Sequence, residues 1–302
     1  MTTATAVGAP VDGGDLPPGR VGLLRSMAAE WTKLWSVRST LWTLVGTAVA
    51  VVGLSALSTG TITPSDIIDD PTRRSLVGIF LGQLVFGVLG VLVMSAEYGT
   101  GTIRSTLAAV PRRPLVLGAK VIVFGVVAVV VSEVLAFTAF ALGQALLSAR
   151  HAVGTSAAVA ARAGQLGVPV PHGLQGLLSG GSASLGQPGV LRAVVGGGLY
   201  LAVLGLLALG LATIIRHTAG AITTFVAIVL VLPLIVEALP ASIGHAVSRY
   251  LPANIGLVLF STHGPPDRVT ASFSPWAGFA LLVGYTVVVL VAGCWVLVRR
   301  DA

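Results

Sequence analysis

Six long apolar stretches, separated by polar segments, dominate the pattern along this chain. They cover residues 41–58, 76–96, 121–148, 193–215, 219–239 and 276–298. A helix needs about 20 mainly apolar residues to cross the hydrocarbon core of a bilayer, and each stretch comes close to that length or exceeds it. The pattern therefore predicts an all-α integral membrane protein with six transmembrane helices in a single domain over residues 41–298.

The third stretch tests this assignment, because Glu133 lies near its middle. An acidic residue at the centre of a span opposes insertion by roughly 2.5 to 3.5 kcal/mol. About thirteen strongly apolar residues between Ile122 and Leu142 favour insertion by roughly 4 to 8 kcal/mol on the same scale. Insertion remains favourable, so the third stretch is kept as a span.

The composition agrees with a lipid environment. Charged residues make up 10% of the chain and hydrophobic residues 55%, whereas soluble domains are about one quarter charged. The single cysteine, Cys294, excludes a disulfide within the chain, and the five histidines show neither metal-ligand spacing nor an HExxH motif. No metal site and no cofactor site is expected in this chain.

The basic residues indicate how the spans are oriented. In an alternating six-span topology, eleven of the eighteen fall on the side that holds both chain ends, and seven on the other side. The side richer in Lys and Arg is the cytoplasm by the positive-inside rule. These residues stand singly or in pairs beside apolar stretches, so nucleic-acid binding is not expected despite the net charge of +7.

The segments outside the spans differ in composition. Residues 1–23 are rich in Gly, Pro, Thr and Ala and are expected to form a disordered cytoplasmic tail, while residues 299–302 form the cytoplasmic end. Residues 24–40 place apolar residues at helical spacing and carry basic residues, which predicts an interfacial helix. That helix either anchors the chain to the membrane or also supplies a docking surface for a cytoplasmic partner. Residues 150–192 are rich in Gly, Ala and Ser and predict a flexible outer loop.

The loop after the second span, residues 97–120, is the most informative polar segment. Gly99 and Gly101 permit the chain to turn sharply out of the membrane, and Thr100 or Thr102 can cap a following short helix. One face of that helix is apolar and comprises Ile103, Leu107 and Val110. Such a helix could place its apolar face in a groove of a partner; an ordinary surface turn is the alternative.

Three stretches of the sequence resemble one known family. The stretch EYGTGTIRSTLAAVPRRPLVLGAK, residues 97–120, looks like the first cytoplasmic loop in membrane subunits of type-2 ATP-binding-cassette (ABC) exporters, especially those of actinobacteria. The stretch AAEWTKLWSVRSTLWTL, residues 28–44, is similar to the start of these permeases. The stretch PGVLRAVVGGGLYLAVLGLLALGLATIIRHTAGAI, residues 188–222, resembles their fourth span and its turn into the fifth. The resemblance extends over most of the chain from Ala28 onward.

This resemblance implies a permease subunit of an ATP-driven exporter in a bacterial plasma membrane, moving a small molecule, peptide or lipid out of the cell. The subunit would pair with a second copy of itself or a related permease, and with a separate cytoplasmic ATPase that binds ATP and magnesium. The family's first cytoplasmic loop forms a coupling helix against the ATPase, and the matching residues here are Glu97, Gly99, Thr102, Ile103, Arg104 and Leu107. The family also has short re-entrant helices before its last span, with counterparts here in residues 243–251 and 255–259. An apparent insertion over residues 150–184 departs from the family and leaves the substrate open.

The chain itself is not expected to be an enzyme. A P-loop requires Gly-Lys followed by Ser or Thr, but the two lysines of the chain, Lys33 and Lys120, follow Thr32 and Ala119. A G-x-S-x pattern over residues 180–183 lies in the predicted outer loop, where a serine would lack a fixed base. ATP hydrolysis is therefore expected on the partner subunit.

Two polar residues inside the third span, Glu133 and Gln144, are candidates for a translocation path. An ionisable residue inside a membrane is a functional candidate because burying it is costly. Glu133 either lines a substrate path or pairs with a basic group on another span; the alternative is a packing residue, protonated or hydrogen-bonded to Gln144 or a serine. A transporter or channel that uses these residues without an ATPase is the alternative function. Gly78 and Gly82 form a GxxxG pattern in the second span, which suits close packing within the chain or against a second copy.

Overall fold

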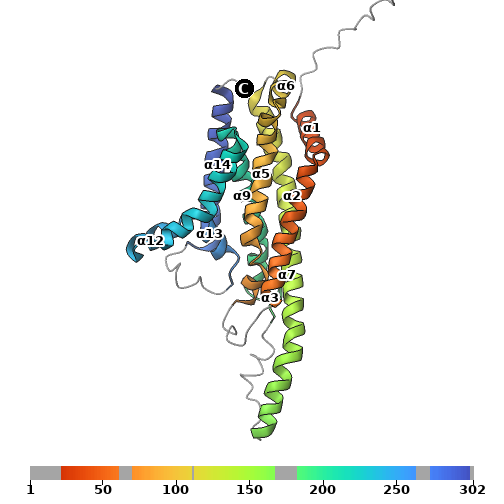
Figure 1. The fold of residues 1–302 in the computed structure, drawn as a ribbon, viewed down its shortest axis with the longest axis vertical. Helices are drawn as coiled ribbons and strands as arrows, with labels where there is room; N and C mark the ends of the chain where they lie inside the picture. The colour runs from red at the N-terminus through yellow and green to blue at the C-terminus, as the bar shows by residue number, and fades with distance from the viewer. Residues whose placement is uncertain (1–21, 61–69, 111, 167–181, 263–272, 300–302) are drawn as a thin grey trace, which may run out of the picture.

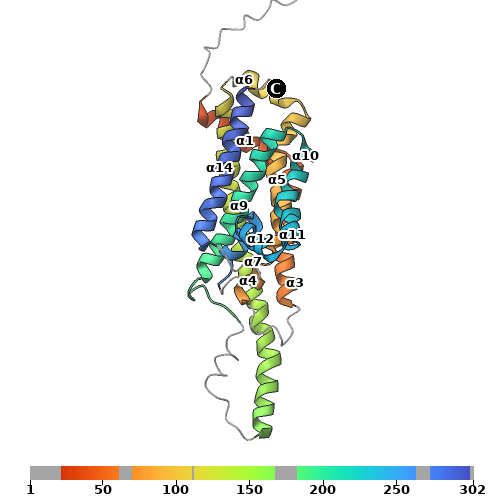
Figure 2. The same cartoon turned by 90° about the vertical axis from the view of Figure 1, so that its left-hand side faces the viewer.

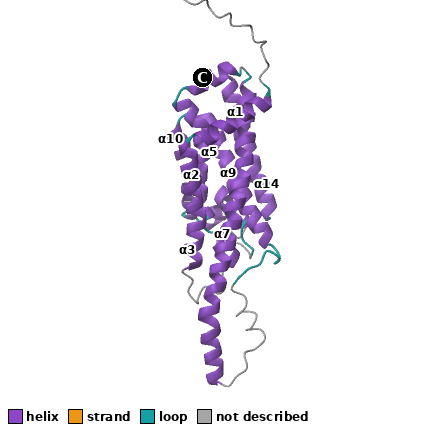
Figure 3. Ribbon diagram, turned by 90° about the vertical axis from the view of Figure 1, so that its right-hand side faces the viewer, coloured by secondary structure: helices purple, strands orange, loops and turns teal. Residues whose placement is uncertain are grey.

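The described part of the computed structural model contains six helices that are long and apolar enough to cross a membrane, which agrees with the predicted number and approximate places of the spans. The structure describes residues 22–60, 70–110, 112–166, 182–262 and 273–299. Within these ranges all regular structure is helical and no strand occurs (Figure 3). The candidate spans are Arg38–Gly60, Ile79–Gly99, Arg113–Ala149, Val190–Ile215, Thr218–Glu237 and Pro275–Arg299.

Figure 1 shows the helices in their order along the chain. The first span is built from α2 (Arg38–Ala48), a π-helical turn η1 (Val49–Gly53) and α3 (Leu54–Gly60), and the fifth from α10 (Thr218–Val226), a second π-helical turn η3 (Ala227–Val231) and α11 (Leu232–Glu237). The other spans are α5 (Ile79–Gly99), the first part of α7 (Arg113–Leu166), α9 (Val190–Ile215) and α14 (Pro275–Arg299). Shorter helices lie between or before the spans: α1 (Leu23–Ser36), α4 (Pro71–Ser75), α6 (Thr102–Ala109), α12 (Ala241–Ser248) and α13 (Pro252–Leu259).

The third span differs most from its prediction. Helix α7 begins at Arg113, eight residues before the predicted start at 121, because Pro114 suits the first turn of a helix. It continues to Leu166, so the prediction of a flexible loop is wrong for residues 150–166. These residues are rich in alanine, the best helix former, and this propensity prevails over the glycine and serine that suggested a loop. The predicted tail, outer loop and chain end otherwise fall largely outside the described residues, at 1–21, 167–181 and 300–302.

A helix is present where the interfacial helix was predicted, as α1, but it ends at Ser36 and not at residue 40. Val37 adopts an extended backbone, with φ −90° and ψ 117°, and separates α1 from the first span. One face of α1 packs against the bundle, and its buried residues are Ser26, Glu30 and Leu34. A second, exposed face carries Leu24, Trp31 and Trp35, which is the amphipathic arrangement of a helix that lies along a membrane surface.

Helix α9 occupies the centre of the bundle, since 67% of its span is buried, against 22% for the spans built from α10–α11 and from α14. Three consecutive glycines, residues 196–198, let other helices approach it closely. A Cβ atom on each glycine would lie 2.6 Å from the side chain that packs there: Leu259 of α13, Ile79 of α5 and Glu133 of α7. The three glycines therefore determine where α5, α7 and α13 contact α9.

The GxxxG pattern of the second span has a partner inside the chain. Val51 of the π-helical turn η1 fills the space that a Cβ atom would need at both Gly78 and Gly82. The backbone N–H of Gly78 also donates to Ser55 Oγ at 3.1 Å. The two glycines thus pack the first and second spans of the same chain together, which is the packing alternative considered from the sequence.

Candidate functional site

One end of the bundle gathers α1, α6 and the last turn of α14, and is called the α6 end below (Figures 1 and 2). The opposite end, called the α4 end, holds α4, α13 and the start of α14 (Figures 1 and 2). Most of the residues matched to the coupling helix lie at the α6 end.

Helix α6 follows α5 through a tight turn. Gly101 has φ +71°, a left-handed conformation that favours glycine, whereas Gly99 is the last residue of α5 and adopts no such angle. The prediction of a threonine cap on α6 is wrong, because Gly101 occupies the N-cap position and no side chain caps the helix. Thr100 Oγ1 instead donates to the carbonyl of Ala96 in the last turn of α5, at 2.8 Å.

The predicted short helix is confirmed, but its apolar face is already covered by the chain itself. Ile103 is 3% exposed and belongs to the core, and Leu107 packs against the same core. Arg104 and Ser105 are exposed on the other side of α6. A partner would therefore meet the polar side of α6 or the edges of the helix, and not the apolar stripe that the sequence suggested.

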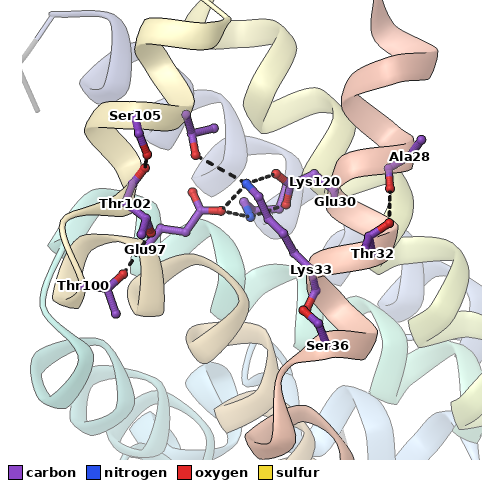
Figure 4. Close-up of polar contacts among 11 residues, drawn as sticks. Ala28, Glu30, Thr32, Lys33, Ser36, Glu97, Thr100, Thr102, Ser105 and Lys120 are labelled. Carbon is purple, nitrogen blue, oxygen red and sulfur yellow. Dashed lines mark hydrogen bonds and ion pairs between the residues drawn. The ribbon is translucent and has the colours of Figure 1, made fainter. Parts of the chain in front are cut away.

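Beneath α6, four charged side chains from three helices form an ion cluster (Figure 4). Lys33 Nζ of α1 lies 2.8 Å from Glu30 Oε1 and 2.9 Å from Glu97 Oε1. Lys120 Nζ of α7 lies 2.5 Å from Glu30 Oε2 and 3.0 Å from Glu97 Oε1. Each lysine thus contacts both glutamates, and the two positive charges balance the two negative charges.

The cluster is buried unevenly. The Lys120 side chain is 3% exposed, whereas the Lys33 side chain is 41% exposed. Burial alone would lower the pKa of the Lys33 ammonium, but hydrogen bonds and charge attraction from Glu30 and Glu97 outweigh it, so the pKa lies above its ordinary value of 10.5. Glu97 Oε2 is buried without a hydrogen-bond partner among the described residues. The Lys33 ammonium is therefore charged at neutral pH, and one carboxylate oxygen of the cluster has no donor among the described residues.

The ion cluster reaches α6 directly. Lys33 Nζ donates to Thr106 Oγ1 of α6 at 3.4 Å, so α1, α5, α6 and α7 are joined through one ammonium group and its neighbours. Sequence reasoning assigned a role to Glu97 but treated Lys33 and Lys120 as membrane flanks and gave Glu30 no role. The available signal was the three-residue spacing of Glu30 and Lys33 on a predicted helix, together with the rarity of lysine in this chain.

A second group of contacts joins the α6 end to the last span. The Arg216 guanidinium lies over the Tyr98 ring, 5.6 Å from its centroid, and its Nη2 donates to the carbonyl of Val296 at 3.1 Å. Arg113 Nη1 donates to the carbonyl of Leu297 at 3.0 Å. The last carbonyls of a helix have no partner within the helix, so these two arginines cap α14 and tie its end to α5, α7 and α9.

A cavity of about 170 Å³ lies between α1, α6 and α7, next to the ion cluster. Small-molecule pockets usually have about 300 to 1,000 Å³, so this cavity suits one side chain better than a free ligand. The lysine and carboxylate groups at its wall are engaged with one another. The remaining wall is largely apolar and includes Ala29 of α1, Ala109 of α6, the following residue Val110, and Val116 of α7.

The two candidates for a translocation path lie elsewhere in α7 and differ in their surroundings. Gln144 is engaged at the α4 end, where its Nε2 donates to Ser75 Oγ at 2.9 Å and its Oε1 accepts from the N–H of Ala183 at 2.5 Å. Both oxygens of Glu133 are buried without a hydrogen-bond partner among the described residues, against Gly198 of α9. The interpretation of Glu133 as a residue hydrogen-bonded to Gln144 or a serine is therefore wrong.

In the part of the chain that the structure describes, no three His, Cys, Asp or Glu residues lie close enough to hold a metal ion. Comparison of the sequence with models of protein families and with curated proteins finds no match.

Proposed function

We propose that this chain is the permease subunit of an ATP-driven exporter in a bacterial plasma membrane, and that a separate ATPase subunit binds at the α6 end. The observation that supports the proposal most directly is the attachment of α6. One side of this short helix is fixed to the bundle through Ile103 and the ion cluster, while the other side is exposed. A helix held in this way suits the transfer of force from a partner to the spans. The resemblance of residues 97–120 to the coupling loop of ABC exporters points to the same role.

The contacts give a route for that force. A push on α6 would act on Lys33 through Thr106, and through Lys33 on the two glutamates. Because Lys120 binds the same glutamates, α1, α5 and α7 would move with α6 as a unit. The Arg216 contacts would carry the movement of α5 to the end of α14.

The cavity beside α6 gives the partner a place to bind. An apolar side chain of the ATPase would enter between α1 and α6, and the exposed Arg104 and Ser105 would contact its surface. In this proposal α1 acts as a docking surface as well as a membrane anchor. ATP and magnesium would be held by the ATPase, and a second copy of this chain or a related permease would complete the transporter.

The test is to fill the cavity. Ala29→Trp places a large side chain in the cavity from α1, whereas Ala28→Trp adds the same side chain at the neighbouring exposed position, which does not line the cavity. The expected result is that a P-loop ATPase co-purifies with the wild-type chain and with Ala28→Trp but not with Ala29→Trp. ATP hydrolysis by the purified complex should follow the same order.

Two outcomes would contradict the proposal. The first is the absence of any P-loop ATPase from complexes of the wild-type chain isolated from its native membrane. The second is transport driven by an ion gradient in vesicles free of ATP, which would support the alternative of a transporter or channel without an ATPase. Equal capture of the ATPase by both tryptophan variants would leave the exporter role standing but remove the cavity as its docking site.

A further inference from the structure

We propose that Arg249, at the α4 end of the bundle, anchors a binding site for a phosphate group. The site lies at the elbow between α12 and α13, on the side of the molecule where α12 projects from the bundle (Figures 1 and 2). It is remote from α6 and does not depend on the exporter proposal.

The guanidinium of Arg249 has hydrogen-bond donors to spare. Its Nε is buried without a partner, and no ion pair forms on this side chain among the described residues. The exposed carboxylate of Glu237 on α11 does not pair with it. A buried donor without a partner is costly, and a guanidinium satisfies its donors best with a phosphate or carboxylate, through two parallel N–H···O bonds.

Two aromatic rings hold the guanidinium in place. It lies 4.8 Å from the centroid of the Tyr250 ring and 5.7 Å from that of Phe273, and the two rings contact each other edge to face at 5.5 Å. Stacking of this kind favours the cation without using its N–H donors. The planar fork is therefore oriented before any ligand arrives.

The backbone around Arg249 is fixed as well. Asn254 Nδ2 of α13 donates to the carbonyl of Ser248 at 2.9 Å, on one side of Arg249. On the other side, Tyr285 of α14 donates its hydroxyl to the carbonyl of Tyr250 at 3.4 Å. The elbow is thus held by both neighbouring helices.

The electrostatic surroundings favour an anion. Helix α13 begins at Pro252 and the 25-residue helix α14 begins at Pro275, so the positive ends of two helix dipoles lie close to the Arg249 side chain. Arg249 lines a recess with Asn254, Phe273 and Ser274, and its volume is about 10 Å³. That volume holds about one water-sized group, so one phosphate oxygen would enter while the rest of the ligand stays at the surface.

The position suggests two sources for the phosphate. Exposed Ile243 and Val247 of α12 and exposed Tyr250 just beyond its end follow at spacings of four and three residues, an apolar stripe that suits a membrane surface. A phospholipid headgroup would then lie beside Arg249. Soluble phosphate carries the same chemistry, and the experiment separates the two.

The experiment measures binding of short-chain phosphatidylglycerol and of inorganic phosphate to the full purified chain in maltoside detergent, which contains no phosphate. Arg249→Gln is expected to weaken binding at least about tenfold, because charge-assisted hydrogen bonds are lost. Arg249→Lys keeps the charge but loses the planar fork, so an intermediate loss is expected. Arg25→Gln removes an exposed arginine at the other end of the bundle and should leave the affinity unchanged.

The outcomes are distinct. Displacement of the lipid by millimolar inorganic phosphate would identify a site open to soluble phosphate, and lack of displacement would identify a lipid headgroup site. No binding of either probe, unchanged binding after Arg249→Gln, or equal weakening by Arg25→Gln would overturn the proposal. If Arg249→Gln does not fold, Arg249→Lys and Tyr250→Leu take its place, and unchanged affinity in both would also overturn it.

Discussion

Replacing Lys120 with methionine should destabilise the protein far more than the same replacement of Lys33. Both lysines contact Glu30 and Glu97, at distances between 2.5 and 3.0 Å. The chief difference is exposure, since the Lys120 side chain is 3% exposed and the Lys33 side chain 41%. The pair of variants therefore isolates the effect of burial on an ion pair.

The expected magnitudes follow from electrostatics. Two unit charges about 4 Å apart attract by roughly 4 kcal/mol at an effective dielectric constant of about 20. Lys120 has two such partners, and removing it leaves two buried carboxylates with less compensation, so a cost of about 3 to 5 kcal/mol is expected. Lys33 is screened by solvent, and its loss should cost about 1 kcal/mol.

The assay is reversible unfolding in mixed micelles with a rising fraction of denaturing detergent, followed by helical circular dichroism. The double variant Glu30→Gln with Lys120→Met tests whether the two side chains interact. It should cost less than the sum of its single variants by about 1 to 3 kcal/mol, as contacting residues usually do. Equal costs for Lys120→Met and Lys33→Met, or strict additivity in the double variant, would refute the reasoning that burial makes this cluster strong.

Three further variants test the packing of α9 and the role of α7. Gly198→Ala should lower the free energy of unfolding by about 1 to 3 kcal/mol in the same assay, because its Cβ would lie 2.6 Å from Glu133 Cδ. In a Glu133→Ala background most of that cost should disappear. Equal costs in both backgrounds would contradict the contact. The Tyr200 hydroxyl donates to Gln83 Oε1 at 2.5 Å, so Tyr200→Phe leaves this buried oxygen without a donor and should cost about 1 to 3 kcal/mol of stability. Adding Gln83→Leu should restore much of the stability. Glu133→Gln should keep the protein level and melting temperature, since the amide has the shape of the carboxylate and no described side chain bonds to either carboxylate oxygen. Transport should fall, and unchanged transport would remove Glu133 from the translocation path.

The candidate site was only partly accessible from sequence. The turn and short helix after the second span could be predicted because glycine, proline and helical spacing act locally, and Gly101 does adopt a left-handed conformation. The ion cluster could not, because Lys120 lies 90 residues from Glu30 and no local rule brings them together. The same limit explains why the apolar face of α6 was assigned to a partner when Ile103 packs into its own bundle.

Six helices long and apolar enough to cross a membrane could be predicted from the residues alone, since length and hydropathy are local properties of a segment. The pattern also predicted α1 and α6 to within a few residues, and the family resemblance indicated α12 and α13, but α4 and the extension of α7 to Leu166 were missed. The central position of α9 depends on contacts between distant segments, because the glycines at 196–198 matter only through the side chains that pack against them. Likewise, Lys33 and Lys120 belong to an ion cluster, whereas Arg249 forms no ion pair with another described residue, because pairing depends on distances in space that the order of residues does not contain.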